Sequence, residues 1–341
     1  MHILITGGAG FLGSRLARAL LQRGTLRGQP ITRLMLADLV APADPALTGD
    51  ARVSTHTGDL LASIPALMAH PWDVVVHLAS AVSAECEAHF DLGLHANLDT
   101  TRSLLDACRA QALRGEPVPV FFFSSSVAVF GNDPALPLPA VVRDDTLPTP
   151  QSSYGVHKFV CEQLVADYTR KGFIDGRAAR LMTVSVRPGR PNGAASGFLS
   201  GLFREPLAGQ PSTCPVALDT AVALSSPANT VAGIVAVLEA DRDTLGGRTA
   251  VNLPALTVTV GDMLQSLERL AGPEVMGLIT HTPDAAVARI VAGWPARFDS
   301  PRAARLGLRA DASFDEVLQQ YVRDHPQAIT HPSARRALGL A

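Results

Sequence analysis

The feature that most constrains the fold of this chain is a glycine-rich loop. An apolar run at residues 3–5 leads into TGGAGFLG at residues 6–13, and helical periodicity follows from Phe11 to Arg23. The loop fits both T-G-x-x-G-x-x-G and G-x-G-x-x-G through Gly7, Gly8, Gly10 and Gly13. Glycines at this spacing between a strand and a helix let backbone amides approach a pyrophosphate at the helix N-terminus. The loop therefore predicts a dinucleotide-binding strand–loop–helix unit.

Short apolar runs alternate with amphipathic stretches through the first half of the chain. The runs are residues 3–5, 34–37, 52–55, 73–78, 118–123 and 182–186, and a long helical stretch extends from about Glu85 to Gln111. Continuous runs of Val, Ile and Phe are typical of strands that are buried on both faces, as in parallel sheets. Strands that alternate with helices predict an α/β fold with a Rossmann-type, doubly wound parallel sheet.

A change in composition near residue 188 predicts a second, smaller lobe. Residues 188–230 are rich in Pro, Gly, Ser and Ala. Helical patterns then return at residues 228–241, 259–271, 283–293 and 313–324. We expect a nucleotide-binding domain at residues 1–187, a substrate lobe mainly at residues 188–325, and a poorly ordered tail at residues 326–341. The run at residues 250–253 is expected to return one strand to the main sheet.

Composition narrows the classes of function. Hydrophobic residues make up 47% of the 341 residues and charged residues 18%, and 29 basic against 31 acidic residues give a net charge of −2. This balance excludes an intrinsically disordered chain and argues against nucleic acid as a partner, because nucleic acid needs a basic surface. No apolar run reaches the roughly 18 residues of a membrane span, so we expect no membrane partner.

The cysteines and histidines predict neither a disulfide framework nor a metal site. The cysteines are Cys86, Cys108, Cys161 and Cys214, and no two of them form a C-x-x-C pair. We expect reduced thiols, no bound metal and a cytoplasmic protein.

Two aspartates follow predicted strands in the first half. Asp38 ends one run, and a carboxylate there accepts hydrogen bonds from ribose hydroxyls and repels a 2′-phosphate. No Arg or Lys follows Asp38 before Arg52, which favours NAD over NADP, although an aspartate here can also cap a turn. Asp59, which is followed by Leu60, can bind the adenine amino group or cap the next helix, and the residues leave both readings open.

A tyrosine and a lysine one helical turn apart form the main catalytic prediction. Tyr154 and Lys158 lie on one face of a predicted helix, where the ammonium is expected to stabilise the phenolate and lower the tyrosine pKa. Tyr154 is then a candidate general base. Three serines at residues 124–126 end a predicted parallel strand, and a hydroxyl there can bond the reacting oxygen. Each feature alone also occurs as a chance helix pair or a helix cap, so the combination carries the prediction.

Together these motifs resemble the extended short-chain dehydrogenase/reductases, the NAD-dependent epimerase/dehydratase group, over roughly residues 1–320. The motifs are TGGAGFLG at residues 6–13, HLA at 77–79, SSSVAVFG at 124–131, TPQSSYG at 149–155 with Lys158, and VRPG at 186–189. Phe130 departs from the tyrosine that is usual before the glycine. The resemblance implies that Ser126, Tyr154 and Lys158 are catalytic and that Asn97 supports a proton relay.

The resemblance also implies an NAD site. Its expected contacts are Gly7, Gly10, Phe11, Leu12, Gly13, Asp38, Asp59, Leu60, Leu78, Ala79, Ser80, Asn97, Tyr154, Lys158 and Pro188.

The substrate lobe lacks the cations that a nucleotide-sugar substrate needs. Residues 205–241 contain no Lys or Arg, whereas nucleotide-sugar epimerases hold a diphosphate in this lobe with basic residues. This difference favours a small substrate without a nucleotide. An acid substrate still needs a counter-charge, although each candidate arginine can equally be a surface charge. The expected substrate contacts are Ser126, Tyr154, Arg190, Asn192, Ser196 and Arg204.

We therefore expect an NAD-dependent dehydrogenase of a short sugar acid, and the resemblance implies that the C2 hydroxyl is the group oxidised. The alternatives are a uronate dehydrogenase or a nucleotide-sugar 4-epimerase of the same family, and, from another class, a non-catalytic NAD-binding regulator. Net production of NADH separates a dehydrogenase from an epimerase, and a regulator does not need the serine, tyrosine and lysine. By resemblance we expect a homodimer formed through the helices near residues 85–111 and 153–171.

Overall fold

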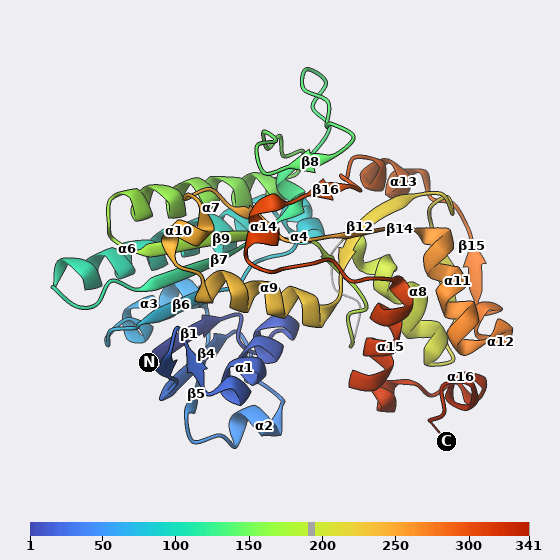
Figure 1. Cartoon of the computed structure of the whole chain (residues 1–341), viewed down its shortest axis with the longest axis horizontal. Coiled ribbons are helices and arrows are strands. Elements are labelled where there is room, and N and C mark those ends of the chain that lie inside the picture. The colour runs from blue at the N-terminus through green and yellow to red at the C-terminus, as the bar shows by residue number, and fades with distance from the viewer. Residues whose placement is uncertain (190–194, 341) are drawn as a thin grey trace.

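The computed structural model describes residues 1–189 and 195–340, and its centre is a seven-stranded parallel sheet (Figure 1). The strand order is β13-β9-β7-β6-β1-β4-β5, with every neighbouring pair parallel. The strands are β1 (His2–Thr6), β4 (Arg33–Asp38), β5 (Val53–Thr57), β6 (Val74–His77), β7 (Val120–Ser126), β9 (Asp175–Leu181) and β13 (Val251–Asn252). The chain winds outward from β1 in both directions, which confirms the predicted doubly wound α/β fold.

Apolar side chains of the sheet alternate between two helical layers. Ile3 and Ile5 pack into one core with α1 and α9, and Leu4 packs into the opposite core with α3, α6 and α7. These helices are α1 (Phe11–Arg23), α3 (Leu60–Leu67), α6 (Thr100–Leu113), α7 (Ser153–Arg170) and α9 (Pro227–Glu239). Because helices cover both faces, central strands such as β1, β6 and β7 contain continuous apolar runs rather than alternating ones.

The helix expected over residues 85–111 is interrupted. Its pieces are α4 (Ser83–Ala88), α5 (Phe90–Gly93), a π-helical segment η1 (Leu94–Asp99) and α6. His89 leaves the helical conformation with φ −135° and ψ 79°. The wider π turn buries Asn97, whose Oδ1 accepts a hydrogen bond from the backbone amide of Ala81 at 2.8 Å. Periodicity did not reveal this break because one extra residue in a turn changes the apolar spacing little.

The sequence pattern predicted the last strand of the first half at the wrong residues. The main-sheet strand is β9, which ends at Leu181, whereas β10 (Thr183–Val184), within the apolar run at residues 182–186, belongs to a second sheet. The strand β9 carries Arg177 and Arg180, both buried, so its pattern looks exposed. Arg177 Nη1 donates to three carbonyls at the end of α9 over 2.7 to 3.0 Å, which compensates in part for burying its charge.

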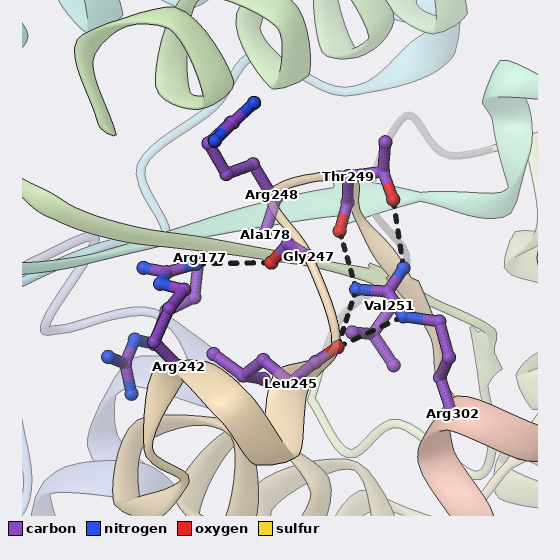
Figure 2. Close-up of a pocket in the computed structure, with 9 residues that line it drawn as sticks. All are labelled: Arg177, Ala178, Arg242, Leu245, Gly247, Arg248, Thr249, Val251 and Arg302. Carbon is purple, nitrogen blue, oxygen red and sulfur yellow. Dashed lines mark hydrogen bonds between the residues drawn. The ribbon is translucent and has the colours of Figure 1, made fainter. Parts of the chain in front are cut away.

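Further arginines join the edge of the sheet to neighbouring helix ends (Figure 2). Arg302 donates through Nη2 to the carbonyl of Leu245, the last residue of α10 (Arg242–Leu245), at 2.9 Å, and through Nη1 to Thr249 Oγ1 at 3.0 Å. Cations at helix C-termini satisfy unpaired carbonyls and favour the helix dipole. In this arginine-rich corner, formed by Arg177, Arg242, Arg248 and Arg302, Arg302 therefore ties α14 (Pro301–Arg305) to the end of α10 and to the segment that leads into β13.

The smaller lobe has its own core. It is built on the sheet β10-β12-β14, the pair β11-β15 and several helices, with Phe203, Leu267 and Val317 fully or almost fully buried. Its elements are η3 (Ala195–Gly197), α8 (Phe198–Leu207), β11 (Ser212–Cys214), β12 (Ala221–Ser225), β14 (Leu256–Thr259), α11 (Val260–Ala271), α12 (Pro273–Met276), β15 (Ile279–His281), α13 (Ala285–Ala292) and α15 (Phe314–Asp324). The helical patterns predicted for this half are confirmed.

The tail of the chain is better ordered than predicted, whereas the predicted return of one strand to the main sheet is confirmed. Residues 326–340 form η4 (Pro326–Ala328) and α16 (Pro332–Ala337), and Ile329 is fully buried in the lobe core, so the expectation of poor order was wrong. The run at residues 250–253 does return a strand, β13, to the main sheet. The domain boundaries at 187/188 and 325/326 stay predictions.

The remaining elements are β2 (Thr25–Leu26), β3 (Gln29–Pro30), α2 (Pro45–Thr48), η2 (Val127–Val129), β8 (Val142–Arg143) and β16 (Phe298–Asp299).

Candidate active site

The candidate site lies at the carboxyl-terminal edge of the parallel sheet. The glycine loop follows β1, Asp38 ends β4, residues 78–80 follow β6, and Ser126 ends β7. Because parallel strands end at one edge, the fold brings these segments together there. Helix α7, which carries Tyr154 and Lys158, packs against β7 and against the turn that follows it.

The glycine loop is too tightly packed for side chains. A Cβ atom on Gly13 would lie 2.1 Å from the carbonyl oxygen of Gly7, and Gly7 itself has a φ of +70°. Gly10 caps α1 without any side-chain hydrogen bond, and Phe11 and Leu12 begin the helix. Amides of a first helical turn together with the helix dipole attract an anionic group. This cradle fits the pyrophosphate of a dinucleotide.

Asp38 holds the glycine loop in place. Its Oδ2 accepts hydrogen bonds from the amides of Ala9 at 3.0 Å and Gly10 at 3.1 Å, and its Oδ1 accepts one from Leu39 at 2.7 Å. The turn-capping interpretation is therefore confirmed, and the contact with a ribose stays a prediction. A carboxylate at this point, beside a loop without side chains, fits the adenosine half of NAD.

The segment after β6 forms the opposite wall of the glycine loop. The amide of Leu78 donates to the carbonyl of Thr6 at 3.1 Å, and the amide of Ala79 donates to Thr6 Oγ1 at 3.4 Å. The hydroxyl of Ser80 donates to Asn97 Oδ1 at 3.0 Å. Asn97 therefore supports the segment that follows β6, and its part in a proton relay stays a prediction.

Asp59 caps the helix that it precedes. Its Oδ1 accepts a hydrogen bond from the amide of Ala62 at 2.9 Å, and Leu60 is the first residue of α3. Of the two readings of Asp59, the helix cap is confirmed. Contacts of Asp59 and Leu60 with adenine stay predictions.

The structure brings Ser126, Tyr154 and Lys158 together, as expected. Ser126 lies close enough to Tyr154 to lower the pKa of its phenol, and Ser126 Oγ accepts a hydrogen bond from the amide of Ala128 at 3.2 Å. Lys158 Nζ lies 5.5 Å from the centre of the Tyr154 ring and donates to the carbonyl of Ser124 at 2.8 Å. A serine, a tyrosine and a lysine in this arrangement can move a proton from a substrate hydroxyl.

Gly155 explains how α7 comes so near to Ser126. A Cβ atom on Gly155 would lie 2.2 Å from the carbonyl oxygen of Ala128, in the turn that follows Ser126. The hydroxyl of Ser152 caps the helix by accepting from the Gly155 amide at 3.1 Å. A larger side chain would therefore separate Tyr154 from Ser126.

The pKa of Tyr154 is raised, which corrects our expectation that Lys158 would lower it. Burial raises the pKa of Tyr154 to about 12, against the smaller lowering effects of Ser126 and of Arg187. Burial also lowers the pKa of Lys158 to about 8. The prediction was wrong because burial disfavours both charged forms, whereas the argument from spacing considered only their attraction.

Arg187 is the functional candidate that sequence reasoning missed. Its guanidinium is half-buried beside Tyr154, and burial together with the neighbouring Arg204 lowers its pKa. Among the residues that the structure describes, no carboxylate forms an ion pair with Arg187, whereas Arg204 pairs with Glu205. The V-R-P-G motif contained the signal, but nothing in the pattern indicated that this arginine lies beside Tyr154. Pro188 follows it at the same edge.

The predicted substrate residues are only partly placed. Arg204 lies on α8, and its Nη1 donates to the carbonyl of Arg187 at 3.0 Å. Ser196 is half-buried in the turn η3 that leads into α8. Arg190 and Asn192 lie outside the described residues.

The described residues contain neither a metal-binding cluster nor a membrane-spanning helix. Within residues 1–189 and 195–340, no three His, Cys, Asp or Glu side chains lie close enough together to hold a metal ion. Within the same residues, no helix has both the length and the apolar character needed to cross a membrane. The four cysteines are buried and form no disulfide.

Comparisons with known proteins agree with this site. A family model described as the NAD dependent epimerase/dehydratase family matches residues 3–252. The D-erythronate dehydrogenase of Cupriavidus necator is 50% identical over 95% of this chain and 98% of that protein. The D-erythronate dehydrogenase of Haemophilus influenzae is 40% identical over 94% of this chain and 99% of that protein.

A solved structure extends the likeness to three dimensions. The crystal structure of the nucleoside-diphosphate-sugar epimerase from Agrobacterium tumefaciens superposes with a TM-score of 0.89 at 38% identity, covering 96% of this chain and 95% of that one. The glycine loop, the Ser126–Tyr154–Lys158 group and these matches lead to one conclusion. The chain belongs to the NAD-dependent epimerase/dehydratase family, the extended short-chain dehydrogenase/reductases, and is an NAD-dependent oxidoreductase.

Proposed function

We propose that this enzyme oxidises the C2 hydroxyl of D-erythronate to the 2-oxo acid. The observation that carries the proposal is the half-buried cation Arg187, which acts on Tyr154 and has no carboxylate partner among the described residues. A short sugar acid brings the carboxylate that such a cation favours. The names of the two D-erythronate dehydrogenases, at 50% and 40% identity, support the same substrate.

The side chains divide the chemistry between them. The Tyr154 phenolate takes the proton of the C2 hydroxyl while Ser126 donates a hydrogen bond to the same oxygen. NAD, when bound, supplies the acceptor for the hydride that leaves C2. Because burial raises the pKa of Tyr154 to about 12, the phenolate needs nearby positive charge, and Arg187 supplies part of it. Lys158 is expected to bind the nicotinamide ribose.

Asp38 supports NAD as the cofactor rather than NADP. Its carboxylate is fixed by two loop amides at 3.0 and 3.1 Å, so it cannot turn away from a 2′-phosphate without releasing the loop. A 2′-phosphate bound beside Asp38 would bring two negative charges close together, and like charges repel. We therefore expect NADP to be a poor substitute.

Arg187 is the candidate that we assign to the substrate carboxylate. The charge of Arg204 is offset by Glu205, because Arg204 Nη2 donates to Glu205 Oε1 at 2.5 Å. Arg204 instead supports Arg187 through the backbone carbonyl. Ser196, and Arg190 and Asn192 beyond the described residues, remain expected contacts for the hydroxyl groups.

A substrate panel tests the proposal. Purified protein with NAD is mixed with D-erythronate, with hexuronates and with UDP-sugars, and the absorbance of NADH is followed. We expect NADH with D-erythronate. A response to hexuronates alone would show a uronate dehydrogenase, and no NADH with any acid would refute sugar-acid oxidation.

A nucleotide-sugar epimerase is the second candidate, favoured by the likeness to the Agrobacterium tumefaciens epimerase at 38% identity. The absence of Lys and Arg from residues 205–241 opposes it, because a diphosphate needs cations. Interconversion of two UDP-sugars without net NADH would establish this reaction.

We further infer a homodimer in the cytoplasm. Phe90 and Leu92 of α5 are 59% and 43% exposed, and Val156 and Val160 of the adjoining α7 are 43% and 37% exposed. An apolar surface shared by two helices favours association with a second copy. The four free cysteines are consistent with a reducing compartment. Light scattering should give twice the chain mass, and a Val160→Glu variant should give the mass of one chain.

A further inference from the structure

A buried ion pair lies directly behind the catalytic residues. Glu162 of α7 and Arg180 of β9 have side chains that are 1% and 5% exposed. Arg180 Nε donates to Glu162 Oε1 at 2.9 Å, and Arg180 Nη2 donates to Glu162 Oε2 at 2.7 Å. The hydroxyl of Ser125 donates to Glu162 Oε1 at 2.5 Å, and Arg180 Nη1 reaches Asn252 Oδ1 of β13 at 3.3 Å. The proposed chemistry does not require these residues.

Stability alone is a poor explanation for this network. Removing two charges from water costs about as much free energy as their attraction returns, so apolar residues often serve as well at a buried position. The network is, however, located at the active-site end of the sheet. Ser125 immediately precedes Ser126, and Glu162 follows Lys158 by one helical turn.

The geometry of α7 shows what the ion pair can fix. Tyr154, Lys158 and Glu162 occupy successive turns on one face of the helix. Lys158 bonds the carbonyl of Ser124 at 2.8 Å, and Glu162 accepts from the hydroxyl of Ser125 at 2.5 Å. Two contacts with consecutive residues of one strand fix both the rotation of α7 and its position along β7. Tyr154, one turn earlier, is thereby placed against Ser126.

The charges around Lys158 point to a second effect. The titratable groups that face it are Tyr154, His157, Cys161 and Glu162 from α7, Cys86 from α4 and His77 from β6, and burial lowers the pKa of His157. Burial raises the pKa of both thiols and of the phenol, and lowers the pKa of His77 to about 3, so these groups are neutral at pH 7. The Glu162 carboxylate is then the negative charge that offsets the burial of the Lys158 ammonium.

We propose that Glu162, held by Arg180, is a positioning residue that keeps Lys158 charged and sets the register of Tyr154 against Ser126. The first part concerns the protein alone. The second part rests on the proposed dehydrogenase function.

The composition of the chain allows a direct test of the first part. Lys158 and Lys171 are its two lysines, and Lys171 is exposed, so ¹⁵N-labelled lysine gives one signal of interest and one reference. Three variants are titrated by NMR. Glu162→Gln keeps the shape and removes the charge, and Glu162→Asp keeps the charge and shortens the reach. The control Glu239→Gln breaks an ion pair with Arg23 on the far side of the sheet.

We expect the midpoint of the Lys158 titration to fall by about 1 pH unit in Glu162→Gln and to stay in place in Glu162→Asp and Glu239→Gln. The turnover number should fall at least about 10-fold in both Glu162 variants, because charge is lost in Glu162→Gln and register is lost in Glu162→Asp. If the single variant folds poorly, the double variant Glu162→Gln/Arg180→Gln replaces it. Its Lys158 midpoint should still fall, by less than in the single variant, because loss of the Arg180 charge partly offsets loss of the carboxylate. An unmoved Lys158 midpoint with a lower melting temperature would overturn the proposal and leave the ion pair a stability device. Because the titration uses no substrate, its outcome is independent of whether D-erythronate is the substrate.

Discussion

The cofactor side and the substrate side of the site are built in different ways. The cofactor side consists mainly of backbone, in the loop at residues 6–13, and its one fixed charge, Asp38, is bonded to that loop. The substrate side consists of side chains from separate elements, namely Ser126, Tyr154 and Arg187. Backbone sites need specific residues at fixed spacing, whereas side-chain sites need only that the fold bring distant residues together.

The two sides also differ in how their charges are satisfied. The Asp38 carboxylate accepts three backbone hydrogen bonds at 2.7 to 3.1 Å. On the substrate side, burial raises the pKa of Tyr154, and the guanidinium of Arg187 lacks a carboxylate among the described residues. This difference fits the proposed function, in which the cofactor side is complete in itself and the substrate carboxylate supplies the missing charge on the substrate side.

The largest expected effect is on the substrate side. Tyr154→Phe removes the base and should lower the turnover number by about 10³- to 10⁴-fold, because no neighbouring group replaces the phenol. NAD affinity, measured by calorimetry, should stay close to that of the wild type. The matched control is Tyr168→Phe, whose hydroxyl bonds Asp106 at 2.6 Å outside the site. Substantial turnover in Tyr154→Phe would show that another residue is the base.

The second prediction tests whether the substrate supplies the missing charge. Arg187→Gln should lower kcat/KM for D-erythronate by at least about 30-fold, because the bound carboxylate loses its partner. Oxidation of neutral polyols should fall less, because it loses only the smaller effect of Arg187 on the Tyr154 phenolate. Arg248→Gln, at an exposed arginine in the corner shown in Figure 2, is the control. Equal losses for acids and neutral polyols would contradict the assignment of Arg187 to the carboxylate.

The third prediction concerns the cofactor side. Gly13→Ala places a Cβ atom 2.1 Å from the Gly7 carbonyl, so the loop has to move. We expect NAD to bind at least about tenfold more weakly and the free energy of unfolding to fall by about 1–3 kcal/mol. Gly293→Ala is the control, since its nearest neighbour lies 3.4 Å away. Normal NAD affinity in Gly13→Ala would show that the loop is less tightly constrained than its geometry indicates.

The smallest effect is spectroscopic. Burial raises the pKa of all three tyrosines, Tyr154, Tyr168 and Tyr321, to about 12, with Asp106 contributing for Tyr168. At pH 10, about 1% of each should be ionised, against half of a free tyrosine. The folded state binds more protons than the unfolded state between about pH 10 and 12, so stability falls as the pH rises through that window. The ionised fraction is measured by a rapid pH jump with detection of absorbance at the tyrosinate band. Strong absorbance at pH 10 before unfolding would contradict the raised pKa values.

The sequence predicted the features that depend on local pattern. The glycine spacing and the apolar runs predicted the sheet, its two helical layers and the edge that holds the site, because burial on both faces requires continuous apolar strands. Tyr154 and Lys158 were predicted from their spacing on one helical turn. Ser126 was predicted from its place at a strand end together with the family resemblance.

What the sequence could not reveal depends on distant partners. The strand β9 was missed because Arg177 and Arg180 are satisfied by α9 and by Glu162, which no local pattern shows. The raised pKa of Tyr154 follows from burial by several elements. Arg187 was passed over for the same reason, since its place beside Tyr154 depends on the smaller lobe.

The most direct test of the central claim follows one hydrogen atom. D-Erythronate carrying deuterium at C2 is incubated with the enzyme and NAD, and the product NADH is weighed by mass spectrometry. If Tyr154 takes the C2 hydroxyl proton while the C2 hydride is transferred, the NADH should be one mass unit heavier. NADH of ordinary mass from this substrate, with deuterium retained in the product acid, would contradict oxidation at C2.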